Sequence, residues 1–189
     1  LPQSLTNCPA TFHPRVIPYL PAALKTIHLQ DAIDDQDAKE ETPLLWSHLP
    51  RFSNCKELYL GALADLAKHP VDIQQIEFPA NLTHLELVSQ QKCMTDPEML
   101  KKLPVGLMSF HTTLSFKEPA RGSGDGIKPG EAPHADEDSR RHPFAHLPAN
   151  LLSLCSTQPC SLPLDPLTDL PKSLTSITFY KVHLHPQWL

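Results

Sequence analysis

The chain repeats one short pattern of hydrophobic and polar positions seven times. Each copy opens on Leu-Pro, or once on Phe-Pro, and follows the form L-P-x-x-L-x-x-L-x-L-x, with seven of the 21 prolines in one position. The last part alternates apolar and polar residues, which is typical of a short β-strand with one buried face. The copies begin at Leu1, Leu20, Leu49, Phe78, Leu103, Leu147 and Leu170, and the copy at Leu49 carries two extra residues.

The spacing of the copies predicts how the strands are connected. Pro fixes φ and removes an amide donor, so the Leu-Pro step suits the turn that leads into each strand. The copies begin 19, 29, 29, 25, 44 and 23 residues apart. Between two of them, Asp96 is a candidate N-cap followed by Pro97, which predicts a short helix ending near Lys102. One strand per copy, followed by a return segment, predicts an α/β fold with a parallel sheet.

The repeated phrase resembles the leucine-rich-repeat superfamily. The L-P-x-x-L-x-x-L-x-L form is similar to the repeats of bacterial effectors, and Leu170 to Phe179 is similar to the LPxSLTxLxF repeats of amoebae. The resemblance implies a solenoid with a curved parallel sheet on its concave face and short helices or turns on its convex face. The chain departs from the family three residues after the last strand leucine, where Asn or Cys is usual. Those positions hold Ala32, Leu63, Gln90 and Ser115.

The pattern predicts one repeat array over residues 1–189, with an insertion in it. We expect about seven repeats and a chain that is a piece of a longer solenoid. Residues 117–143 hold four of the six glycines, four prolines, eleven charged residues and no aromatic residue. Such a segment buries too little apolar surface to offset the entropy lost on ordering. We therefore predict a flexible insertion there, tolerated as a surface loop.

Composition and charge narrow the classes of partner and compartment. The formal net charge is −5 and the pI about 6.1, without a basic stripe, which disfavours nucleic acid as a partner. No apolar run approaches the roughly 18 residues of a membrane span. The five cysteines are odd in number and form no CxxC pair, which favours free thiols in a reducing compartment. We expect a cytoplasmic protein.

Residues that flank the buried leucines of each strand are predicted to line the concave face in rows. Adjacent strands lie about 4.8 Å apart, so equivalent positions of successive copies become neighbours. The middle row is predicted to hold Pro9, His28, Tyr59, Glu86, His111, Cys155 and Thr178, and the preceding row Asn7, Thr26, Glu57, His84, Ser109, Ser153 and Ser176. Solenoids bind through such surfaces, so His28, Glu57, Tyr59, His84, Glu86 and His111 are the candidate binding residues for a protein partner.

The sequence is also compatible with two functions other than protein recognition. The concave face of a purely structural spacer is an ordinary solvated surface without a ligand. A metal-binding or catalytic protein would use His84, Glu86 and His111, a zinc-type set of side chains, but their positions are dictated by the repeat register. Cys8 and Cys55 occupy leucine positions and are predicted core residues, while Cys155 is predicted on the concave face. We expect no enzyme activity, no metal and no cofactor.

Overall fold

The computed structural model describes residues 1–30, 47–61, 76–88, 94–95, 97–113, 115–116, 143–156 and 170–179. Residues 117–142 of the predicted insertion lie outside these ranges. So do Ala32, Leu63 and Gln90, three of the four positions at which the sequence departs from the leucine-rich-repeat family that it resembles. Pro143, the last residue of the predicted insertion, begins a short helix.

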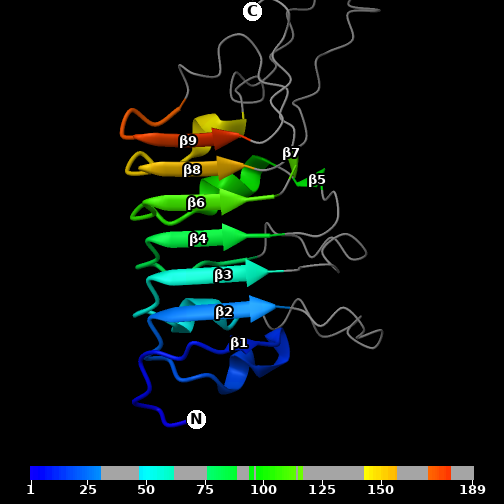
Figure 1. The fold of residues 1–189 in the computed structure, drawn as a ribbon, viewed down its shortest axis with the longest axis vertical. Helices are drawn as coiled ribbons and strands as arrows, with labels where there is room; N and C mark the ends of the chain where they lie inside the picture. Colours follow the sequence, from blue (N-terminus) through cyan, green and yellow to red (C-terminus); the bar gives the residue numbers. More distant parts are fainter. Residues whose placement is uncertain are drawn as a thin grey trace, which may run out of the picture.

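The predicted parallel sheet is confirmed, and its strands follow one another in sequence order along the long axis of the molecule (Figure 1). All six pairings in this seven-stranded sheet are parallel. A separate two-stranded parallel sheet joins β5 (Met94–Thr95) and β7 (Ser115–Phe116). The strands of the main sheet are β1 (Thr11–Phe12), β2 (Thr26–Gln30), β3 (Glu57–Gly61), β4 (His84–Leu87), β6 (Ser109–Thr112), β8 (Ser153–Ser156) and β9 (Ser176–Phe179).

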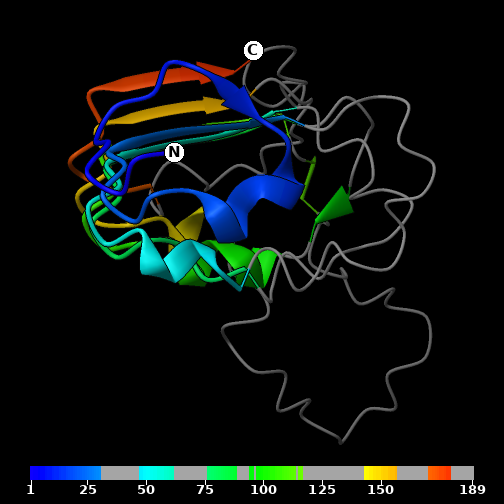
Figure 2. The ribbon, with the colours of Figure 1, turned by 90° about the horizontal axis from the view of Figure 1, so that it is seen from below.

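Short 3₁₀-helices form a second layer on one face of the sheet (Figure 2). They are η1 (Pro14–Tyr19), η2 (Leu49–Arg51), η5 (Pro97–Lys102) and η7 (Pro143–His146). The helix predicted to end near Lys102 is therefore present as η5, in the tighter 3₁₀ form that is common in short connecting segments. The other face of the sheet, which we call the open face, carries the side chains that alternate with the buried leucines.

A tight turn precedes every strand of the main sheet. In six copies the proline carbonyl accepts a hydrogen bond from the amide three residues later, as in Pro21 to Leu24 (3.3 Å) and Pro148 to Leu151 (3.0 Å). Proline is thus residue i of the turn, directly ahead of the two central residues whose φ and ψ define it. In the copy at Leu49, Phe52 takes the proline position and accepts from the Cys55 amide at 2.9 Å.

From the second copy onwards, each turn is joined to the next by one carbonyl that accepts two amides. The Lys25 carbonyl receives the amides of Lys56 (2.7 Å) and Glu57 (3.1 Å), and the Lys56 carbonyl receives those of Thr83 and His84, both at 2.9 Å. The same pair of bonds recurs at the carbonyls of Thr83, Met108 and Leu152. These bonds fix the register in which a strand meets its neighbour at the first residue of that strand.

The core lies between the sheet and the layer of 3₁₀-helices. It is built from rows of leucines and related residues: Ile27, Leu58, Leu85, Phe110 and Leu154 form one row, each at most 2 % exposed. A second row continues from Leu29, Leu60 and Leu87 into Thr112 and Ser156, which are buried polar residues.

Two copies differ from the predicted alignment. The turn in the copy at Leu49 begins at Phe52, so Pro50 is not in the turn but in η2, close to the start of that helix, where a missing amide costs nothing. In the first copy, Thr11 rather than Pro9 lies beside His28, because Thr6 is held opposite Lys25 and two extra residues precede β1. Proline has no amide to donate to a sheet, so Pro9 suits this irregular approach.

The shift in the first copy also changes the environment of Cys8. Cys8 is half-buried and packs against the core, rather than occupying a fully buried leucine position as predicted. Cys55 is fully buried and lies at a core position, as predicted. The predicted preceding row likewise begins at Thr26, since Asn7 lies ahead of β1.

The buried row predicts a contrast in stability between its middle and its end. Leu58 is fully buried between Ile27 and Leu85, whereas Ile177 of β9, in the same row, is 42 % exposed. We expect Leu58→Ala to lower the free energy of unfolding by about 2–5 kcal/mol and Ile177→Ala by about 1 kcal/mol or less. Urea unfolding of the two variants and the unsubstituted chain measures the difference. Equal losses would contradict the placement of Leu58 in the core.

Candidate interaction surface

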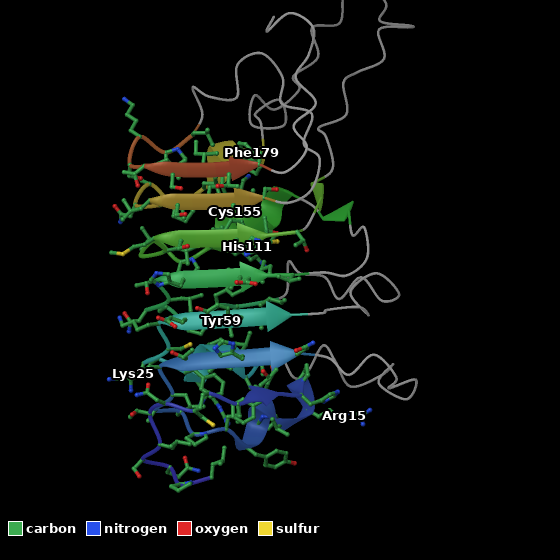
Figure 3. All side chains as sticks on the ribbon, viewed as in Figure 1. Arg15, Lys25, Tyr59, His111, Cys155 and Phe179 are labelled. Atoms are coloured by element: carbon green, nitrogen blue, oxygen red, sulfur yellow. The ribbon has the colours of Figure 1, made fainter. Side chains whose placement is uncertain are left out.

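The six candidate residues lie on the open face of four neighbouring strands, β2, β3, β4 and β6. Parallel pairing sets His28 beside Tyr59, Tyr59 beside Glu86, and Glu86 beside His111, which we call the middle row. Glu57 of β3 lies beside His84 of β4 in the preceding row. The side chains stand side by side along the sheet, with Tyr59, His111 and Cys155 following one another in Figure 3. Beyond His111 the middle row continues with Cys155 and Thr178.

An aromatic pair begins the chemically varied part of the middle row. The rings of His28 and Tyr59 are stacked, with centroids 4.2 Å apart and planes inclined by 8°. Both side chains are half-buried, so each gives the other a flat apolar contact while leaving part of its surface open. Since His28 covers one face of the Tyr59 ring from β2, the other face is turned towards β4, where Glu86 is the register partner.

Two carboxylates lie close to the Tyr59 hydroxyl. Burial raises the pKa of Tyr59, and the negative charges of Glu57 and Glu86 and a hydrogen bond to Glu57 raise it further. Glu57 also accepts a hydrogen bond from the Thr26 hydroxyl at 3.3 Å. The hydroxyl of Tyr59 therefore stays protonated at neutral pH and acts as a hydrogen-bond donor between two acids.

An acid–imidazole pair follows the aromatic pair. Glu86 Oε2 lies 3.4 Å from His111 Nδ1, and the two side chains are 35 % and 33 % exposed. The other ring nitrogen of His111, Nε2, is buried and makes no hydrogen bond within the described part of the chain. The pair is an ionic contact only when His111 is protonated, and a partly exposed contact of this kind contributes little to folding stability.

His84 does not join Glu86 and His111 in a metal site. Its Nδ1 atom lies 3.0 Å from the Thr83 hydroxyl, and the side chain is exposed near the start of β4. Glu86, two residues further along the strand, instead contacts His111. In the part of the chain that the structure describes, no three His, Cys, Asp or Glu side chains are grouped closely enough to hold a metal ion.

Glu86, His111 and Cys155 follow one another across three strands in the order acid, imidazole, thiol. A carboxylate that orients a histidine beside a thiol is the arrangement of a cysteine nucleophile. However, His111 Nε2 forms no hydrogen bond with the thiol, and burial together with the charge of Glu86 raises the pKa of Cys155. Cys155 therefore remains a protonated thiol at neutral pH, which is a weak nucleophile.

Sequence reasoning missed an apolar strip at the edge where the strands begin. Val105, Met108 and Leu152 are 75 %, 46 % and 41 % exposed. Leu152 donates its amide to the Met108 carbonyl, and Asn150 donates its side-chain amide to the Val105 carbonyl, so the three lie on adjacent turns. The signal was visible in the phrases LPVGLMSF and LPANLLSL, where Met108 and Leu152 fill a position that holds Thr or Lys in other copies.

The described residues contain no helix that is both long enough and apolar enough to cross a membrane. No known protein family, curated protein or solved structure matches the chain. What the open face does must therefore be inferred from its own side chains.

The environment of Cys155 predicts how its reactivity depends on pH. In a variant with Cys8, Cys93 and Cys160 replaced by Ser, Cys155 is the reactive thiol, because Cys55 is fully buried and burial raises its pKa to about 11. We expect the iodoacetamide rate to rise only above the ordinary thiol range of roughly pH 8.5. Adding Glu86→Gln removes a negative charge beside the thiol, so the pH profile should move to lower pH while burial still holds it above the ordinary range.

Mass spectrometry of alkylated Cys155 across a pH series makes this measurement. Glu77→Gln, which removes an exposed carboxylate away from the row, is the matched control and should leave the profile in place. Fast alkylation near neutral pH would show that His111 activates the thiol and would overturn the conclusion that it is a weak nucleophile.

Proposed function

We propose that the chain is a leucine-rich-repeat solenoid that recognises a protein partner through the open face of its sheet. The observation that carries the proposal is the unbroken middle row, in which a stacked His28–Tyr59 pair adjoins the Glu86–His111 pair. A half-buried aromatic ring beside polar side chains of fixed position is the usual composition of a binding hot spot.

The way the row is built also favours recognition over a spacer. Its side chains come from successive copies held in one register by backbone bonds, so they are ordered before a partner binds. Rigid presentation reduces the entropy lost on association. In a spacer, the residues at these positions need only keep the surface of the sheet hydrated. A stacked aromatic pair would contribute nothing to that role.

Cytoplasmic location belongs to the same proposal. Three cysteines in the described part of the chain, Cys8, Cys55 and Cys155, are free thiols, and two of them are only half-buried. Free thiols of this kind suit a reducing compartment.

Truncation of the middle row is expected to abolish partner capture without unfolding the protein. The variant is Tyr59→Ala/Glu86→Ala/His111→Ala, used beside the unsubstituted chain as bait in a lysate of the source cells. Truncation of one hot-spot side chain costs about 2 kcal/mol or more of binding free energy. The three truncations together should therefore remove the partner from the eluate. Far-UV circular dichroism and urea unfolding establish that the variant remains folded.

A control variant of the same composition separates the row from the rest of the surface. Tyr19→Ala/His48→Ala/Glu77→Ala replaces one tyrosine, one histidine and one glutamate that are exposed outside the open face. It should retain the partner. If both variants retain the same partner, or the unsubstituted chain retains none, the open face is not a recognition surface. Those results would favour a structural spacer.

A further inference from the structure

Negative charge on the open face is concentrated around one aromatic ring. Glu57 and Glu86 lie on β3 and β4 and both act on the hydroxyl of Tyr59. The remaining open-face residues of β6, β8 and β9 are small hydroxyl side chains, apart from His111 and Cys155. They are Ser109, Ser153, Ser176 and Thr178.

Within the described part of the chain, neither Glu57 nor Glu86 forms an ion pair with a lysine or an arginine. Lys25 lies at the end of the sheet where the strands begin and points away from the row (Figure 3). Arg51 is engaged on the other layer, where its guanidinium donates to the carbonyls of Pro18 (2.8 Å) and Ile17 (2.7 Å). The basic side chain that contacts one of these two acids within the described ranges is His111, whose Nδ1 lies 3.4 Å from Glu86 Oε2.

We propose that the partner segment bound by the open face is basic, and that one of its arginine side chains docks on Tyr59 between Glu57 and Glu86. This inference rests on the proposed recognition function and gives the chemistry of its partner. The carboxylates supply charge complementarity, and the half-buried ring of Tyr59 supplies the aromatic surface between them that a guanidinium can contact.

Arginine fits this place better than lysine. Its guanidinium is planar, lies flat on aromatic rings and donates up to five hydrogen bonds in a fixed fork that matches carboxylate oxygens. A lysine ammonium is more strongly hydrated and makes point contacts. Nucleic acid is disfavoured as the occupant, because its phosphates would meet two carboxylates rather than cations.

The test uses three fluorescein-labelled peptides of nine residues, in which a Gly-Ser background carries three Arg, three Lys or three Glu. Their affinity for the full chain is measured by fluorescence anisotropy at low salt, where exposed charges are least screened. We expect the Arg peptide to bind about two- to fivefold tighter than the Lys peptide, and the Glu peptide not to bind.

Single substitutions locate the site. Tyr59→Leu removes the ring, and Glu86→Gln removes the charge while keeping the shape of the side chain. Each substitution should lower the affinity for the Arg peptide about two- to fivefold. Tyr59→Phe keeps the ring and should weaken it less than Tyr59→Leu. Glu77→Gln changes the net charge by the same amount as Glu86→Gln, at an exposed position away from the row, and should have little effect.

Three results would overturn the proposal: no binding of the Arg peptide, equal binding of the Glu peptide, or equal weakening by Glu77→Gln and Glu86→Gln, which would indicate attraction to net charge alone. These results are distinct from failure of the recognition function. A partner lost from the Tyr59→Ala/Glu86→Ala/His111→Ala bait would still establish the open face as a binding surface, with a partner of different chemistry.

Discussion

The structure depends on backbone carbonyls, placed just before five of the seven strands of the main sheet, that each accept two amides from the next copy. Lys25, Lys56, Thr83, Met108 and Leu152 each provide such a carbonyl. The two bonds set the register of each new strand at its first residue, and a slip of one residue would turn every leucine of that strand to the open face. Both the buried rows and the middle row follow from this constraint.

A fixed register also assigns alternate residues of each strand to two roles, packing in the core and lining the open face. Leucines, or other apolar residues at the same positions, fill the core, as Leu58 and Leu85 do. The residues between them can differ from copy to copy. On β2, β3, β4 and β6 these residues form a stacked aromatic pair and an acid–imidazole pair, while β8 and β9 carry small polar groups. The fold therefore presents varied chemistry without disturbing its core, and the variation is confined to one part of the sheet.

Sequence reasoning predicted the parallel sheet and the placement of the candidate residues because both follow from one periodic signal. It was wrong for Pro9, which was predicted in the middle row although Thr11 is the residue that pairs with His28. It was also wrong for Pro50, whose Leu-Pro pair was predicted to form the turn although the turn begins at Phe52. The His28–Tyr59 stack and the Glu86–His111 contact could not be predicted, since they depend on side-chain rotamers and not on register alone. The solenoid and its membership of the leucine-rich-repeat superfamily stay predictions.

The most direct test of this account is a nuclear Overhauser measurement between the ring protons of His28 and Tyr59, which come from different copies of the pattern. With ring centroids 4.2 Å apart, the register described above predicts strong cross-peaks between the two rings. If Tyr59 instead shows contacts to core leucines and none to His28, β3 is displaced by one residue, and neither the middle row nor the surface built on it exists.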